Sequence, residues 1–258
     1  MLSTTTLVLA GFVVLFGGLV KGTVGFGYAI ASTALLAVFL SPSTAVVLMI
    51  VPMLVANVSL VRELDRAEIT RCLKRFWPYV LSAMVGTVVG MVLLDFVRTS
   101  LLTPALGVFT LAYVAVKQPW LVLPGEEAVA RYCFRRDTTV KVALGLVSGV
   151  IFGLSNVAVQ VVAYLDGLEL DRSTFVGVLA MILVGVSGLR IGMAWTLGLY
   201  DGGNLLLYSV GLSVPGLVGV TLGGKLRRVT SERAQLAAVL LLLTVIGVRL
   251  LAVGLGVL

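Results

Sequence analysis

Long, nearly uncharged apolar runs are the feature of this chain that most restricts its fold. Of its 258 residues, 59% are hydrophobic and 12% are charged, whereas a soluble domain carries roughly twice that share of charge. About twenty apolar residues span a bilayer as a helix, and several runs approach that length. The runs fall at about 7–20, 27–40, 44–61, 77–94, 100–116, 142–165, 173–189, 191–199, 205–224 and 234–257. They are continuous rather than alternating, so they exclude a transmembrane β-barrel and predict an all-α polytopic membrane protein.

The location follows from the same runs. The first run lacks the basic leader and small-residue cleavage pattern of a signal peptide, so we expect it to be retained. We therefore predict a multi-pass protein of the cell inner (plasma) membrane, with the lipid bilayer as its surroundings.

A glycine-rich pattern occurs twice, about 127 positions apart. Residues 18–22 read Gly-Leu-Val-Lys-Gly, and residues 145–149 read Gly-Leu-Val-Ser-Gly. The segment 58–62 likewise matches 186–190 at an offset of about 128. We infer that one unit is used twice. The predicted division is a first transmembrane repeat at 1–120, a cytoplasmic linker at 121–140 and a second transmembrane repeat at 141–258.

Spaced glycines also correspond between the two halves. Gly86 and Gly90 match Gly219 and Gly223, and each pair has the spacing that lets two helices approach closely. Such pairs fit internal packing or a homodimer interface equally well, and the sequence leaves both open.

The distribution of charge predicts how the repeats are oriented. Basic residues cluster at 62–75, 117–141 and 225–233, and the positive-inside rule places these connections in the cytoplasm. The connections at about 95–99 and 190–204 are poor in Lys and Arg and are assigned to the outside. Equivalent connections of the two halves thus carry opposite charge bias, which predicts inverted-topology repeats.

Each repeat opens with a segment that is too long for one crossing and is interrupted by glycine and polar residues. We predict a broken or re-entrant leading segment, formed by two half-helices, with tips at 21–28 and 148–156. About three spanning helices follow in each repeat, at 44–61, 77–94 and 100–116, then at 173–189, 205–224 and 234–257. Breaks at membrane depth line cavities, because protein or water must satisfy the freed backbone. Plain kinked helices packed through small residues are the alternative.

The residue inventory argues against catalysis. The chain has no histidine, no paired acids within an apolar run and no nucleotide-binding Gly-Lys-[Ser/Thr] motif. We therefore predict no enzyme, no catalytic residue, no metal site and no cofactor. The net charge of +7 is explained by positive-inside topology and does not require a nucleic-acid partner.

Duplication around an interrupted hydrophobic segment is typical of secondary transporters, and the residues at the interruptions suit a small anion. Helix N-termini present unpaired N–H groups that favour negative charge, and a lysine at depth usually faces a cavity or a partner. The candidate substrate-binding residues are Lys21, Gly22, Thr23, Gly25, Gly27, Tyr28, Gly149, Gly153, Ser155, Asn156, Gln160 and Arg190.

Alternatives remain for several of these residues. Lys21 could bind an anion or take part in proton coupling, or it could extend along its aliphatic stem to the interface. The polar residues at the tips could instead only bridge helices. Arg190 is expected at the mouth of a pathway, where it would raise the local anion concentration. Tyr200, near a predicted segment end, is expected in the interfacial aromatic belt.

At these residues the chain resembles the TauE/SafE family of sulfite exporters, also called four-TMS-repeat sulfur permeases. The resemblance rests on Gly18-Leu-Val-Lys-Gly22-Thr-Val-Gly25-Phe-Gly27, on Gly145-Leu-Val-Ser-Gly149-Val-Ile-Phe-Gly153 and on the segment 219–228, and it covers nearly the whole chain. Both glycine stretches depart from the family pattern: Gly25-Phe-Gly27 replaces a glycine triplet followed by proline, and Gly153-Leu-Ser155-Asn156 replaces a Gly-Gly run.

The resemblance implies a permease that exports a small anion, sulfite or an organosulfonate such as sulfoacetate. The expected mechanism is alternating access at a midplane site between the repeats, driven by a proton gradient or by the membrane potential. An accessory or scaffold membrane protein without transport activity of its own is the alternative.

Overall fold

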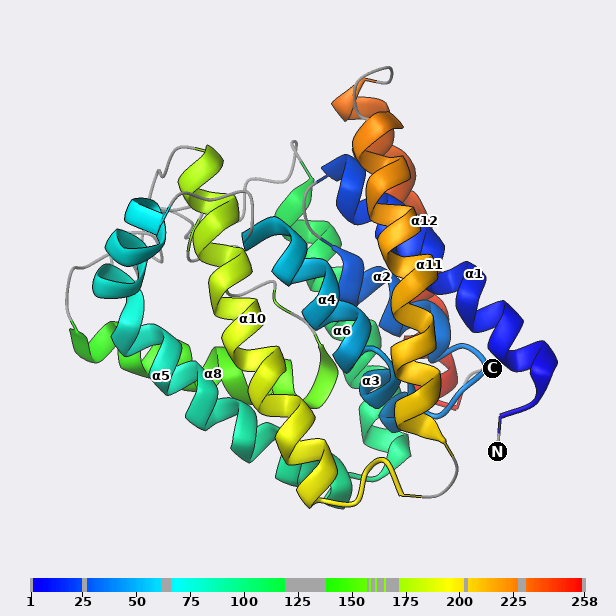
Figure 1. Cartoon of the computed structure of the whole chain (residues 1–258). Coiled ribbons are helices and arrows are strands. Elements are labelled where there is room, and N and C mark those ends of the chain that lie inside the picture. The colour runs from blue at the N-terminus through cyan, green and yellow to red at the C-terminus, as the bar shows by residue number, and fades with distance from the viewer. Residues whose placement is uncertain are drawn as a thin grey trace.

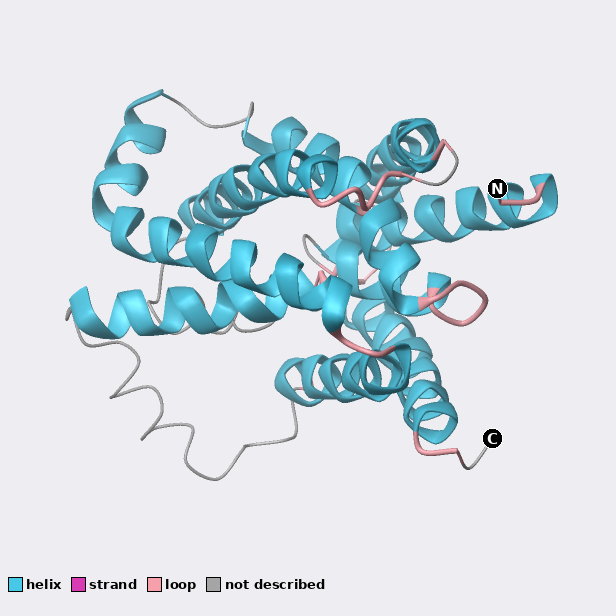
Figure 2. Cartoon of the chain, turned by 90° about the horizontal axis from the view of Figure 1, so that it is seen from below, coloured by secondary structure: helices cyan, strands magenta, loops and turns pink. Residues whose placement is uncertain are grey.

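The computed structural model describes residues 2–24, 27–61, 66–118, 138–156, 172–201, 204–226 and 231–256, together with residues 158, 161 and 165. Helices are the only regular elements within these residues (Figures 1 and 2), so the all-α prediction is confirmed. The helices are α1 (Thr4–Val24), α2 (Tyr28–Leu36), α3 (Pro42–Leu48), α4 (Ile50–Val61), α5 (Arg66–Phe96), α6 (Thr99–Lys117), α8 (Thr138–Ser155), α10 (Arg172–Thr196), α11 (Leu205–Leu226) and α12 (Glu232–Gly254).

Six stretches of the described residues are long and apolar enough to cross a membrane. They are Thr4–Thr23, Pro42–Ser59, Phe76–Leu94, Thr138–Ser155, Val178–Thr196 and Leu205–Leu226. Shorter apolar stretches, Ser100–Ala112 and Leu240–Gly254, lie in α6 and α12. These helices therefore support a multi-pass membrane protein.

Both leading segments break inside the predicted tips. α1 ends at Val24, and α2 begins after Gly27, whose φ of 91° is left-handed. α8 ends at Ser155 and is followed by Asn156, also left-handed with a φ of 62°. The helices before the breaks are longer than the expected half-helices, because the 21 residues of α1 extend about 31 Å at 1.5 Å per residue.

Helices from the two halves pack against one another throughout the molecule. α1 packs against α11, and α8 packs against α5. α4 contacts α10, and α6 contacts α12. Figure 1 shows the α5–α8 pair on one side and the α1–α11 pair on the other, with α4 and α10 between them.

The repeated glycines form the closest of these contacts. A Cβ added to Gly22 would lie 2.7 Å from the backbone nitrogen of Gly224 in α11. A Cβ added to Gly149 would lie 2.8 Å from the backbone nitrogen of Thr87 in α5. Backbone meets backbone at both crossings, as small-residue spacing allows in membrane helices.

Other helix faces expose large apolar side chains at a spacing of about one turn. On α11 they are Val210, Val214, Val218 and Leu222, and on α5 they are Trp77, Leu81, Val85, Val89 and Leu93. Continuous apolar faces of this kind are unusual on a soluble monomer, and in a bilayer they contact the hydrocarbon chains.

Candidate functional site

Lys21 lies inside the protein rather than at a membrane interface. Its side chain is 6% exposed, and its Nζ donates a 2.5 Å hydrogen bond to Oδ1 of Asn57 in α4. The same Nζ lies 5.9 Å from the centroid of the Tyr28 ring, within the range of a cation–π contact. The ammonium therefore has a neutral amide and an aromatic ring as its partners.

Two hydroxyl groups of α2 lie against neighbouring helices, that of Ser32 against α1 and that of Tyr28 against α11. Tyr28 and Ser32 are one turn apart and buried, and neither hydroxyl has a hydrogen-bond partner among the described residues. A Cβ added to Gly17 in α1 would clash with the Ser32 hydroxyl, and one added to Gly216 in α11 would clash with that of Tyr28. Glycine at these two positions leaves room for both hydroxyls, and we name Lys21, Tyr28, Ser32 and Asn57 the lysine cluster.

Arg190 is the second buried cation, and its position corrects the prediction of a charge at the mouth of a pathway. α10 continues to Thr196, because residues 191–196 contain no helix-breaking proline, and Arg190 is fully buried within it. Its Nη1 donates to Oδ1 of Asn156, and its Nη2 donates to the Gly153 carbonyl at 3.4 Å. Its Cζ lies 5.1 Å from the centroid of the Phe152 ring.

Asn156 connects Arg190 to the first half of the chain. Its Nδ2 donates to Oγ1 of Thr33 in α2 at 3.1 Å and to the Val46 carbonyl in α3 at 2.9 Å. Asparagine tolerates the left-handed backbone at this position better than most residues do. We name Arg190, Asn156, Thr33 and the Gly153 carbonyl the arginine cluster.

Polar atoms close to Arg190 remain unsatisfied within the described residues. The Nε of Arg190 and the Oγ of Ser187, one turn earlier in α10, are buried without a hydrogen-bond partner. Tyr200 is buried at 8% exposure rather than placed in an aromatic belt. Burial raises the pKa of Tyr200 to about 12, and the Arg190 guanidinium opposes this rise, so the phenol is neutral near pH 7.

The remaining predicted residues are accounted for by packing and by local hydrogen bonds. Gly22, Gly149 and Gly153 lie against neighbouring helices. The hydroxyls of Thr23 and Ser155 donate to carbonyls of their own helices, at 2.9 and 2.6 Å. Gly27 precedes α2, and Gly25 and Gln160 lie outside the described residues.

The structure thus brings Lys21 together with Tyr28, and Arg190 together with Gly153 and Asn156. Sequence reasoning missed Asn57, Thr33 and Phe152, as well as the buried hydroxyls of Ser32 and Ser187. Asn57 had a detectable signal, because it is an amide within the apolar run 44–61, and polar residues at membrane depth usually have a partner.

Within the part of the chain that the structure describes, no carboxylate contacts either buried cation. The buried polar residues among those described are Lys, Arg, Asn, Ser and Thr, with no Asp or Glu. An ionised group in an apolar interior is costly unless an opposite charge or several hydrogen bonds compensate it. Buried cations that meet only neutral groups give this protein an interior suited to anions.

Six apolar stretches of spanning length define a multi-pass membrane protein, and its described interior holds two buried cations that contact neutral groups. The family model described as "Sulfite exporter TauE/SafE" matches residues 10–250, and the chain belongs to this family. It is therefore a plasma-membrane exporter of sulfur anions, and its family is one of transporters rather than enzymes. No curated protein and no solved structure shows significant similarity to the chain.

Proposed function

We propose that this protein exports sulfite, or an organosulfonate such as sulfoacetate, by alternating access at a midplane site between two inverted repeats. The observation that carries the proposal is the burial of Lys21 and Arg190 against neutral groups, with no carboxylate partner among the described residues. A small sulfur oxyanion would supply the missing negative charge together with several hydrogen-bond acceptors.

The hydrogen-bond partners of both cations are suited to a substrate that binds reversibly. Asn57 and Asn156 each present an amide oxygen to a cation, which stabilises the charge without neutralising it. A carboxylate in their place would form a permanent ion pair and compete with an anionic substrate. Neutral amides keep the net positive charge available.

The pairing of helices supports two repeats related by a pseudo-two-fold axis, and the opposite charge bias of their equivalent connections supports an inverted orientation. By sequence correspondence, α1 is equivalent to α8, and α5 is equivalent to α11. The contact of α1 with α11 is then equivalent to the contact of α8 with α5. A pseudo-two-fold axis generates this exchange, and in transporters of this kind the substrate site lies at the interface of the repeats.

The driving force in this proposal is the membrane potential. Proton-coupled carriers usually rely on buried acids, and the described residues include no buried Asp or Glu. Moving one negative charge out of a negative interior releases ~2.3 kcal/mol per 100 mV, which is enough to drive export without a coupling ion.

A homodimer is not part of the proposal. Gly86 and Gly90, which could have supported one, lie against Leu146, Val150 and Gly153 of α8 in the same chain. The small-residue face of α5 is thus occupied internally.

The test is electrogenic flux in proteoliposomes that contain only this protein. The panel comprises sulfite, sulfoacetate, sulfate, phosphate and chloride, each measured with an imposed potential and separately with an imposed pH gradient. We expect a saturable current with a sulfur oxyanion that follows the potential and is insensitive to the pH gradient. Silence across the panel from folded protein would contradict the proposal and favour the accessory or scaffold role.

A further inference from the structure

The two cation clusters lie on different faces of the short helix α2. Tyr28 and Ser32 contribute to the lysine cluster, whereas Thr33 receives a hydrogen bond from Asn156 in the arginine cluster. Tyr28 and Thr33 are five residues apart, which at 3.6 residues per turn is a rotation of about 140°. α2 therefore stands between the two clusters.

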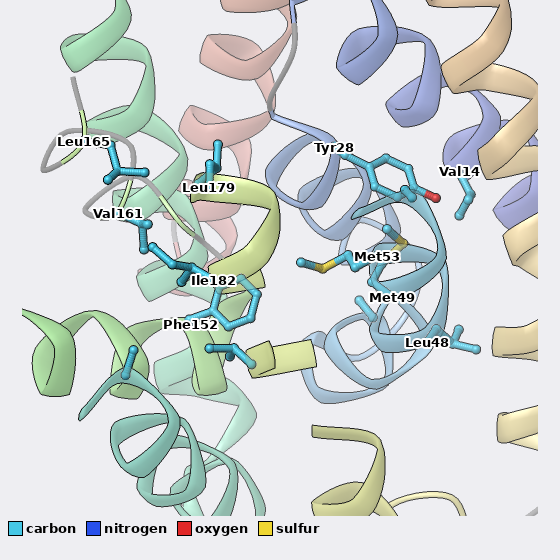
Figure 3. Close-up of a cluster of buried hydrophobic side chains, with 14 of the residues drawn as sticks. Val14, Tyr28, Leu48, Met49, Met53, Phe152, Val161, Leu165, Leu179 and Ile182 are labelled. Atoms are coloured by element: carbon cyan, nitrogen blue, oxygen red, sulfur yellow. The ribbon is translucent and has the colours of Figure 1, made fainter. Parts of the chain in front are cut away.

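Apolar side chains also separate them. Figure 3 shows Met53 between Tyr28, the aromatic partner of Lys21, and Phe152, the aromatic partner of Arg190. Met49 and Met53 are buried in the same hydrophobic cluster as both rings. No hydrogen bond or ring contact among the described residues joins one cluster to the other.

We propose that the protein holds two separate anion positions on opposite sides of α2, rather than a single position shared by both cations. This inference rests on the proposed function and deepens it. At the first position, the Lys21 ammonium lies 5.9 Å from the centroid of the Tyr28 ring, and the Tyr28 and Ser32 hydroxyls of α2 are buried without a partner among the described residues. At the second position, the Arg190 guanidinium is joined by the unpartnered hydroxyl of Ser187.

The two positions differ in chemistry. A lysine ammonium is a compact charge with three N–H donors, only one of which is used by Asn57. A guanidinium presents a rigid planar fork that binds two oxygens of an oxyanion at once, and in this structure its Nη1 holds the Asn156 amide oxygen. The Nε has no hydrogen-bond partner among the described residues, and Nη2 makes only the 3.4 Å contact with the Gly153 carbonyl. An anion can therefore bind the Nε–Nη2 edge in the bidentate mode, and this fixed planar edge makes the arginine position the more restrictive of the two.

Two anion positions also explain how an interior that attracts anions strongly can release them. An anion at the second position repels one at the first, and multi-site occupancy of this kind promotes exit in selective pathways. One position with both cations would instead hold a small anion strongly.

The experiment uses selenite, which has the pyramidal shape of sulfite and scatters X-rays anomalously. Crystals of the full chain soaked in selenite are expected to show two separate selenium peaks, one in hydrogen-bonding reach of the Lys21 Nζ and one beside Arg190. A single peak that contacts both cations, or a peak at only one of them, would overturn the inference.

Substitutions show which cation each selenium peak belongs to. Lys21→Gln is expected to abolish the first peak and keep the second, and Tyr28→Phe, a milder change, should lower the occupancy of the first peak alone. Lys225→Gln removes an exposed lysine at the end of α11 and should keep both peaks. Loss of both peaks in Lys21→Gln crystals would show one coupled site and contradict the inference.

The flux assay separates failure of this inference from failure of the proposed function. Wild-type protein that carries sulfite current but shows one selenium peak retains the proposed function and refutes the second position. Wild-type protein with neither current nor peaks refutes both.

Discussion

The lysine cluster and the arginine cluster place the same kind of charge in the same protein, yet they hold it differently. Among the described residues, Lys21 donates a hydrogen bond to Asn57 and lies near the ring of Tyr28. Arg190 is enclosed completely and contacts Asn156 and Gly153, and Asn156 in turn binds α2 and α3. Arg190 therefore helps to hold the break after α8 in place, whereas Lys21 contacts the helix that follows the break after α1 through the Tyr28 ring.

The two cations therefore differ in role, although the sequence alone predicted the same role, substrate binding, for Lys21 and Arg190. A cation with spare donors can change its ligand at little structural cost. A cation that orients a bridging amide contributes to stability and to binding together, since a buried hydrogen bond to a charged group contributes about 1.5–3 kcal/mol. Substitutions at the two positions should accordingly differ in both size and kind.

Arg190→Gln should have the largest effect. It removes the charge and the guanidinium contacts with Asn156 and Gly153, and we expect sulfite flux to fall about 100-fold, the equivalent of ~2.7 kcal/mol. Differential scanning calorimetry of the purified protein should also show a lower Tm. Arg249→Gln, at an exposed arginine of α12, is the matched control and should change neither quantity. Normal Tm with lost flux would refute the architectural role given to Arg190.

Gly149→Ala should come next, because it disturbs the helix contact that supports the arginine cluster. Its Cβ would lie 2.8 Å from the Thr87 backbone nitrogen and close to the Ala83 carbonyl, and overpacking of this kind costs about 1–3 kcal/mol. We expect a Tm lower by several degrees. Gly188→Ala, where a Cβ meets nothing within 4 Å, is the control. Equal Tm values for the two variants would show that the α8–α5 crossing can relax.

The same two clusters show what a sequence can and cannot reveal. Apolar runs and duplicated glycines are local patterns, so the helices and the positions of both breaks followed from them, whereas the left-handed backbone at the breaks did not. The partners of the cations are long-range: Asn156 meets Thr33 123 residues away, and Arg190 meets Asn156 34 residues away. Arg190 was misplaced because charge composition alone suggested a loop, whereas the helix continues past it. Only three-dimensional packing shows whether such a charge faces water or the protein interior.

Lys21→Gln should affect binding more than stability. It removes the ammonium but keeps a donor for Asn57, so we expect an unchanged Tm and a KM for sulfite raised about tenfold, or ~1.4 kcal/mol. Asn57→Asp should raise KM in the same way, because a carboxylate beside Lys21 neutralises the charge that attracts the anion. Lys225→Gln supplies the control in the same flux assay. A KM unaffected by both substitutions would remove Lys21 from the site.

The last effect, on stability alone, is expected at the backbone of the two breaks, where Gly27 and Asn156 both adopt a left-handed conformation. Gly27→Ala forces an alanine into a region that costs about 1–2 kcal/mol for ordinary residues, so its Tm should fall slightly. Gly27→Asn gives the first break the residue type of the second, and because asparagine visits this region more readily, its Tm should lie between those of wild type and Gly27→Ala. Thermal unfolding of the three proteins in one detergent measures the series. If Gly27→Asn is less stable than Gly27→Ala, the space around the first break, rather than its backbone conformation, determines the preference for glycine there.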